Sequence, residues 1–288
     1  MAFKRLRLYG ELVMFSHTLF SLPFALAAML ISAGGFPGWH KTIWIILAFT
    51  GGRNAANALN RVIDHDIDAR NPRTAGRHLP SGRLRRRDAL LIAAAGTVLL
   101  IVSAFMLNLL CVLLLPFAVA AFVVYSYTKR FTWLCHVILG AACAAASFGA
   151  WIAVTGRIEL STFVIAAANA AWVAGFDVIY AIQDIDFDRA EGLYSIPARF
   201  GEKLSRLAAA GMHAASVFFL TATGYLNGLG VYFYAGVGII AVLFIIEHLL
   251  VIPERVGRNS RLINFAAYNM NQIIGITLIS FTVLDFLL

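Results

Sequence analysis

The residues of this sequence that are best suited to chemistry are aspartates placed at helical spacing. The first group lies in Asn60-Arg-Val-Ile-Asp64-His-Asp-Ile-Asp68. In an α-helix, residues four apart are separated by ~40° around the axis and ~6 Å along it, so Asn60, Asp64 and Asp68 are expected to share one face. Carboxylates on one face suit a divalent metal with a phosphate-rich ligand, because Mg²⁺ is typically held by one or two carboxylates plus the phosphates.

The same spacing returns 120 positions later, where Asp184 and Asp188 correspond to the first pair. Tyr180 stands four residues before Asp184, and Asp177 stands one turn earlier. Six of the fifteen acidic residues of the chain lie in these two groups. One such group alone would be interpreted as solvated acids at a helix end. Two matched groups predict a shared site that holds one metal–diphosphate complex.

The composition predicts an integral membrane protein. Of the 288 residues, 60% are hydrophobic and 13% are charged, whereas soluble domains carry roughly 25% charged residues. The three cysteines all lie in or beside apolar runs and are odd in number, which argues against a disulfide framework or a metal site. No phosphate-binding glycine loop or nucleophile elbow occurs.

A membrane span needs about 20 apolar residues, and on this basis we predict an all-α bundle of nine transmembrane helices that forms a single domain over 1–288. Short turns around Asn108 and over 225–230 should join two of the helix pairs as hairpins. The predicted spans are 11–33, 42–63, 89–107, 109–127, 134–155, 161–183, 205–226, 231–251 and 263–287.

The basic residues predict the orientation of this bundle. Twenty of the twenty-three Lys and Arg residues fall at the N-terminus or in the connections on the same side of the membrane, and only Lys41 and Arg157 fall on the other side. Because positive residues stay cytoplasmic, the N-terminus and both aspartate groups are expected on the cytoplasmic face. The net charge of +8 therefore indicates membrane topology and no nucleic-acid partner.

Two further sets of polar residues have more than one interpretation. Arg73 and Arg77 follow the first aspartate group in a loop with Pro72, Gly76 and Pro80. They suit anion binding and simple topological anchoring equally well, and the loop is expected to fold over the site. The histidines within the predicted spans, such as His136, appear isolated and suit hydrogen bonds between helices better than metal binding.

Carboxylates, a metal and arginines at the mouth of an apolar bundle suit a diphosphate whose apolar tail lies among the helices. The metal and the cationic side chains would stabilise the charge that builds on departing pyrophosphate. An allylic diphosphate would leave a carbocation for an electron-rich ring to capture, in a dry cavity that 22 Phe, 9 Tyr and 5 Trp make possible. A cation-coupled transporter is the alternative, but it is expected to carry its charges near the bilayer midplane.

The motifs resemble those of the UbiA superfamily of intramembrane aromatic prenyltransferases. The run 60–68 is similar to its N-x-x-x-D-x-x-x-D signature, and 184–188 to its second D-x-x-x-D. The run 73–82 resembles its R-T-x-x-R-x-L-P-x-G element, and 127–130 its lysine-arginine element. The resemblance implies Mg²⁺-dependent transfer of a polyprenyl group from its diphosphate to an aromatic acceptor. It also implies diphosphate binding through Mg²⁺ by Asn60, Asp64, Asp68, Asp184 and Asp188, with direct contacts from Arg77 and Lys129.

Within the superfamily, the chain is most similar to 4-hydroxybenzoate polyprenyltransferases of respiratory quinone synthesis and their relatives. The run 175–201 resembles relatives of the futalosine route to menaquinone, which would act on 1,4-dihydroxy-6-naphthoate. Both acceptors are small phenolic carboxylates, so the choice between them stays open. We expect the protein in a bacterial cytoplasmic (inner) membrane, in contact with membrane lipid, and the sequence indicates no protein partner.

An anionic acceptor needs a cation of its own, and Arg53 lies within a predicted span, two turns before Asn60. Arg53 is therefore a candidate for acceptor binding, and pairing with a carboxylate such as Asp177 is an equally good interpretation. Asp177 is in turn a candidate base for the ring proton or a supporting residue. Tyr180 completes the predicted substrate-binding set.

Overall fold

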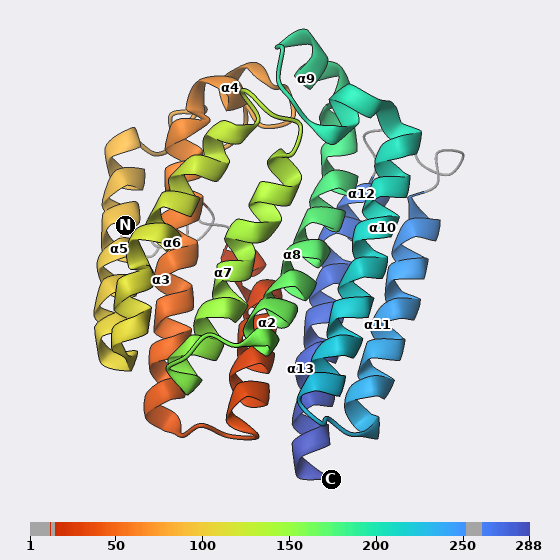
Figure 1. Ribbon diagram of the computed structural model, residues 1–288. Helices are drawn as coiled ribbons and strands as arrows, with labels where there is room; N and C mark the ends of the chain where they lie inside the picture. The colour runs from red at the N-terminus through yellow and green to blue at the C-terminus, as the bar shows by residue number, and fades with distance from the viewer. Residues whose placement is uncertain (1–11, 13–14, 252–260) are drawn as a thin grey trace. The chain divides into compact units, whose positions relative to one another are not determined.

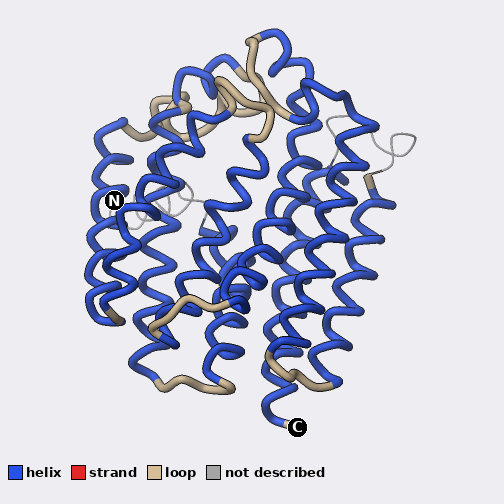
Figure 2. The backbone as a smooth tube through the Cα atoms, viewed as in Figure 1, coloured by secondary structure: helices blue, strands red, loops and turns tan. Residues whose placement is uncertain are grey.

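The computed structural model describes residues 12, 15–251 and 261–288. All regular elements of this part of the chain are helices, and no strand is found in it (Figure 2). Backbone contacts divide the chain into two compact units: 1–19 with 39–127, and 20–38 with 128–288. Each unit is built from the antiparallel packing of long apolar helices.

The first unit contains the start of α2 (Phe15–Ala33), up to residue 19, and four further described helices: α3 (Trp39–Ile63), α4 (His65–Arg70), α5 (Arg86–Leu107) and α6 (Leu109–Thr128) (Figure 1). Helix α3 packs along α5. A Cβ atom on Gly51 would lie 2.6 Å from the carbonyl oxygen of Gly96, and the reverse distance is also 2.6 Å. Only glycine permits this approach, which fixes the helix that carries the first aspartate group against its neighbour.

The second unit is centred on α8 (Leu160–Ala181), which packs against both α7 (Cys135–Thr155) and α10 (Ile196–Leu226). Its other elements are η1 (Ile182–Asp184), α9 (Ile185–Ala190), α11 (Val231–Leu250), α12 (Arg261–Asn264), the π-helix η2 (Phe265–Met270), α13 (Asn271–Leu287) and the part of α2 (Phe15–Ala33) from residue 20 onward. Phe24 of α2 stacks on the buried Trp172 of α8 at 5.2 Å between ring centroids. Helix α11 lies along α10 and α13.

Each of the nine predicted spans contains a helix in the described part of the chain, and seven helices there are long and apolar enough to cross a membrane. Helix α3 is not among the seven, and the apolar part of α2, Leu22–Ala33, is shorter than a span. Residues 11, 13 and 14 of the first predicted span lie outside the described part. The predicted hairpin turns are confirmed, because α5 and α6 are separated only by Asn108 and α10 and α11 by 227–230.

The start of one helix was predicted too far along the sequence. Helix α10 begins at Ile196, nine residues before the expected start at 205, and bends at Gly201, whose φ is +76°. Its first turns carry Glu202, Lys203 and Arg206, which lowered the apolar signal of this segment. The helix is therefore longer than its apolar part.

Candidate functional site

Both aspartate groups lie at the same kind of helix break. Helix α3 ends at Ile63, and Asp64, with φ −92° and ψ 3°, leads into the six-residue helix α4. Helix α8 ends at Ala181 and passes through η1 to Asp184, with φ −100° and ψ 4°, which leads into the six-residue helix α9. The sequence predicted unbroken helical stripes, and the structure corrects this to a long helix, a break at an aspartate and a short helix. Figure 1 shows the two short helices, α4 and α9.

In the first unit, the break keeps the predicted neighbours together. Helical backbone hydrogen bonds continue across it, from Asp64 N to Asn60 O at 2.9 Å and from Asp68 N to Asp64 O at 2.8 Å. The Asn60 amide donates to Asp64 Oδ2 at 2.9 Å and to Ser126 Oγ of α6 at 3.3 Å. Asn60 therefore orients the carboxylate of Asp64, which is only 4% exposed.

Asp68 is equally buried and is surrounded by basic and polar groups of the following loop. Arg77 Nη1 donates to Oδ1 and Oδ2 of Asp68 at 2.7 and 2.8 Å, and Arg61 Nη1 lies 3.9 Å from Oδ2. The Thr74 hydroxyl donates to the backbone carbonyl of Asp68 at 3.0 Å. The loop thus folds back onto the aspartate group and places Arg77 beside a carboxylate. Arg73 is half-buried in the same loop.

The acids between the paired aspartates face solvent. The Asp66 side chain is 74% exposed and accepts hydrogen bonds from Arg86 Nη2 at 2.6 Å and from His65 Nδ1 at 2.8 Å. The hydrogen bond from His65 and the charge of Arg86 lower the pKa of Asp66. Asp186 occupies the corresponding position of α9 and is also exposed. The six clustered acids therefore separate into two that are buried (Asp64 and Asp68), two that are half-buried (Asp184 and Asp188) and two that are exposed.

In the second unit, Asp188 is held by the start of the next long helix. The Ser195 hydroxyl donates to Asp188 Oδ2 at 2.8 Å and accepts from the backbone N–H of Ala198 at 3.1 Å, so Ser195 also caps α10. Asp184, Lys129 and His136 lie close enough to Asp188 to act on its charge. Backbone contact between Tyr194 N and Lys129 O at 2.7 Å fixes this side of the site.

Two further residues of the predicted set lie on α8. The Asp177 carboxylate contacts His136 Nδ1 of α7 at 2.6 Å. Tyr180 meets Tyr268 of the π-helix edge to face, with ring centroids 5.2 Å apart. Arg53 lies half-buried on α3, two turns before Asn60, as the sequence predicted.

The donor set suits a metal that shares its coordination with a substrate. No three His, Cys, Asp or Glu residues of the described chain are grouped closely enough to hold a metal by themselves. Each break supplies two aspartate carboxylates, and the first adds an amide oxygen at Asn60. Oxygen ligands of this kind suit Mg²⁺, which usually keeps the remaining positions for water and phosphate.

Several polar residues of the site were missed or misjudged from the sequence. Ser126, Arg61 and Ser195 contact the aspartate groups, and only the serine before Ile196-Pro197 carried a recognisable signal, that of a helix cap. The expectation that the histidines of the spans make hydrogen bonds between helices is confirmed for His136, which contacts Asp177 of α8, and for His213, whose Nδ1 lies 3.0 Å from Nε2 of His248 in α11. The sequence did not identify these partners, because they are distant along the chain and no local pattern could reveal them.

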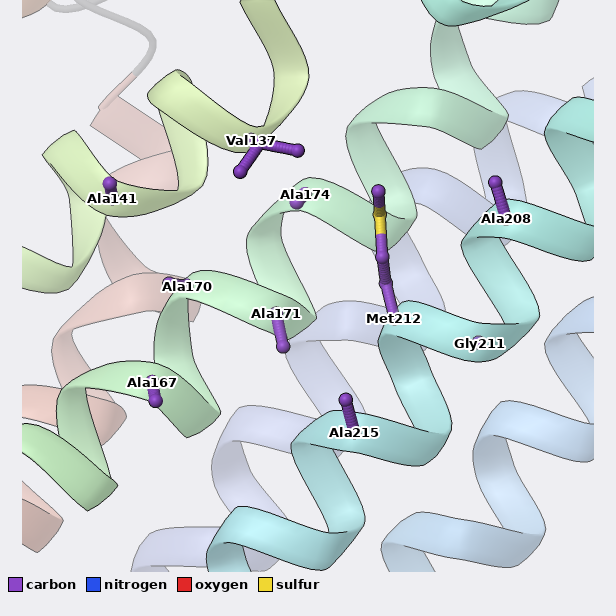
Figure 3. A pocket seen from close by; sticks show the side chains of 10 residues that line it. All are labelled: Val137, Ala141, Ala167, Ala170, Ala171, Ala174, Ala208, Gly211, Met212 and Ala215. Carbon is purple, nitrogen blue, oxygen red and sulfur yellow. The ribbon is translucent and has the colours of Figure 1, made fainter. Parts of the chain in front are cut away.

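The second unit also contains an apolar cavity of about 420 Å³ between α7, α8 and α10 (Figure 3). It is lined by Val137, Ala141, Ala167, Ala170, Ala171, Ala174, Ala208, Gly211, Met212 and Ala215. None of these side chains is charged. This cavity is therefore suited to hydrocarbon and is separate in character from the aspartate groups.

The fold and sequence match known proteins over most of the chain. The model of the UbiA prenyltransferase family matches residues 21–271. The 4-hydroxybenzoate octaprenyltransferase of Citrobacter koseri is 31% identical over 255 residues, which cover 87% of this chain and 85% of that protein. The corresponding enzyme of Klebsiella pneumoniae is 33% identical over 75% of each chain.

Among solved structures, the apo structure of a UbiA homologue from Aeropyrum pernix K1 superposes with a TM-score of 0.84 and 35% identity, covering 93% of this chain and 98% of that one. A UbiA homologue from Archaeoglobus fulgidus, bound to GPP and Mg²⁺, shares the fold with a TM-score of 0.73 at 21% identity, over 98% of this chain and all of that one. With the seven long apolar helices of its described part and its aspartate groups, this chain belongs to the UbiA prenyltransferase family of integral membrane proteins.

Proposed function

We propose that this protein transfers a polyprenyl group from polyprenyl diphosphate to a small aromatic acid of the 4-hydroxybenzoate type, in a Mg²⁺-dependent step of respiratory quinone synthesis. The observation that carries the proposal is the repeated helix break, which twice sets a pair of aspartates beside basic side chains. The named activity of the Citrobacter relative and the ligands of the Archaeoglobus homologue support it.

Both aspartate groups are proposed to act on one diphosphate through the metal. Bound Mg²⁺ supplies positive charge that neutralises the diphosphate and stabilises the leaving pyrophosphate. The residues that would hold it are Asn60, Asp64, Asp68, Asp184 and Asp188. Asn60 keeps Asp64 in position, and Ser195 does the same for Asp188, so the carboxylates are oriented before substrate binds.

Basic side chains are proposed to bind the phosphate oxygens directly. Arg77 donates hydrogen bonds to the Asp68 carboxylate in this structure. The Arg77 guanidinium would therefore contact both Asp68 and a bound diphosphate. Lys129 lies near Asp188 and would serve the other aspartate group. Arg73 comes from the same loop as Arg77 and would add positive charge at the entrance.

The acceptor end of the site is proposed to lie further along the same helices. Arg53 lies two turns before Asn60 on α3, and Asp177 and Tyr180 precede Asp184 on α8. Arg53 would bind the carboxylate of the aromatic acid. Pairing of Arg53 with a protein carboxylate remains the competing interpretation, although Asp177 already has His136 as a partner.

The choice of acceptor is decided by direct assay. Membranes that contain the protein are incubated with a long-chain prenyl diphosphate, Mg²⁺ and either 4-hydroxybenzoate or 1,4-dihydroxy-6-naphthoate, and the product mass is measured. A prenylated 4-hydroxybenzoate is the expected product. A prenylated product from the naphthoate alone would assign the protein to the futalosine route to menaquinone. The run 175–201 resembles proteins of that route. The absence of any prenylated acid would contradict the proposal.

We further propose that nine helices cross the membrane with the N-terminus in the cytoplasm. The twenty basic residues on one side support this orientation. It places the diphosphate site on the cytoplasmic face of a bacterial inner membrane, where soluble phenolic acids have access to it.

A further inference from the structure

His136 of α7 and Asp177 of α8 form a polar pair to which the proposed diphosphate binding assigns no role. His136 Nδ1 lies 2.6 Å from Asp177 Oδ2 and joins the start of α7 to the last turns of α8. A carboxylate only accepts, so the imidazole must carry its proton on Nδ1. Such a short contact in an apolar bundle fixes the orientation of both side chains.

The position of Asp177 relates it to the reacting carbon atoms. Asp177 lies in the last turns of α8, and Asp184 follows it in the chain through the short 3₁₀ helix η1. If Asp184 and Asp188 hold the diphosphate, we expect its first prenyl carbon and the acceptor ring beside the preceding turns of α8. Asp177 lies in these turns.

The two members of the pair differ in access. The Asp177 side chain is 24% exposed, whereas that of His136 is 5% exposed. His136 Nε2 is buried and makes no hydrogen bond with the described residues. The Asp177 carboxylate is therefore accessible to a substrate, and the buried His136 holds it through the hydrogen bond from Nδ1.

We propose that Asp177 is the base that removes the ring proton and that His136 is its positioning residue, an inference that rests on the proposed prenyl transfer. The ring π electrons form the new bond to the allylic carbon, and the electron pair of the broken C–O bond leaves with pyrophosphate. The C–H electron pair then returns to the ring, and the proton passes to the Asp177 carboxylate. His136 keeps the carboxylate within hydrogen-bonding distance of the ring, as general-base catalysis requires.

The test compares an acceptor deuterated at the attacked ring carbon with the unlabelled acid. Asp177→Asn should lower kcat by ~10²–10⁴-fold, the usual contribution of a general base. Its primary isotope effect on kcat should exceed that of the wild type, because proton removal becomes limiting. His136→Asn should show a smaller loss with the same rise in isotope effect, and KM for the prenyl diphosphate should stay constant in Asp177→Asn.

Two controls separate this role from a structural one. Ser147→Ala removes a hydrogen bond from Asn169, 3.1 Å long, which joins the same two helices, and it should leave the isotope effect unchanged. Asp184→Asn should reduce turnover without raising the isotope effect, because diphosphate cleavage becomes limiting. Asp177→Glu restores a carboxylate and should recover part of the lost kcat. This recovery would show that the loss in Asp177→Asn comes from the missing carboxylate and not from poor folding.

The outcomes distinguish the inference from the function on which it rests. If the wild-type protein prenylates no phenolic acid, the proposed function is wrong. If the wild type is active but the Asp177 and His136 variants show the same isotope effect as the wild type, Asp177 is not the base. The proposed prenyl transfer would then still stand.

Discussion

At the scale of single residues, burial distinguishes acids that the sequence presents as equals. Asp64 and Asp68 are 4% exposed and are held by Asn60 and Arg77, whereas Asp66 between them points into solvent. An enclosed carboxylate next to basic groups can bind a metal–diphosphate complex, whereas a surface acid interacts mostly with water.

This difference gives a matched set of substitutions. Asp64→Asn and Asp184→Asn should each lower turnover by ~10²–10³-fold, the usual cost of losing one preorganised electrostatic group. Asp66→Asn and Asp186→Asn, on the exposed positions of the same short helices, should remain within a few-fold of the wild type. Prenyl transfer at saturating Mg²⁺ is the measurement, and equal losses in all four variants would contradict the assignment.

The contact between Arg77 and Asp68 predicts a separation of stability from activity. Arg77→Gln leaves a buried carboxylate with less compensation and should lower the free energy of unfolding by about 1–3 kcal/mol. Adding Asp68→Asn should restore the midpoint of thermal unfolding in detergent but leave prenyl transfer abolished. Recovery of activity in the double variant would show that the two residues serve only the fold.

How far the site could be predicted depends on the distance between partners along the chain. The pair Asn60 and Asp64 could be predicted, because helix geometry fixes neighbours four residues apart. The pair His136 and Asp177 could not, because 41 residues separate them and only the packing of α7 on α8 brings them together. The break at Asp64 was also missed, since no proline or glycine marks it.

At the scale of elements, the helices were largely predictable because apolar length alone specifies them. The long apolar runs of α5, α6 and α11 are recovered almost residue for residue. The start of α10 was not, because its first turns are polar and lie beside Asp188 and Arg189, outside any apolar run.

The close contact between α3 and α5 leads to a specific prediction about helix packing. Gly51→Ala would place a methyl group 2.6 Å from a backbone oxygen of α5, so the helices must separate. Overpacking of this kind typically costs about 1–3 kcal/mol, and we expect a lower unfolding midpoint and a lower yield of folded protein. Gly149→Ala in α7, which has no atom within 4 Å of the added methyl, is the control and should be neutral or slightly stabilising.

At the scale of the whole molecule, the central prediction is that the two aspartate groups serve one substrate. Groups that act on the same diphosphate are coupled, so their substitutions should not be additive. The double variant Asp64→Asn/Asp184→Asn should lose much less activity than the product of the two single losses. Fully multiplicative losses, measured as kcat/KM for the prenyl diphosphate, would indicate two independent sites.

The orientation of the chain is tested by labelling from each side of the membrane. A cysteine introduced at Arg85, in the basic connection before α5, should react only with reagents on the cytoplasmic side. One introduced at Gly228, in the turn before α11, should react only from the opposite side. The reverse pattern would move both aspartate groups to the other face.

The matching breaks at Asp64 and Asp184 also constrain which changes in chain length the protein can accept. At each break one aspartate follows the long helix, and the second lies four residues later in a six-residue helix. One residue inserted or deleted between the two aspartates would turn the second carboxylate by about 100° relative to the first. We therefore expect each pair to require its spacing of four.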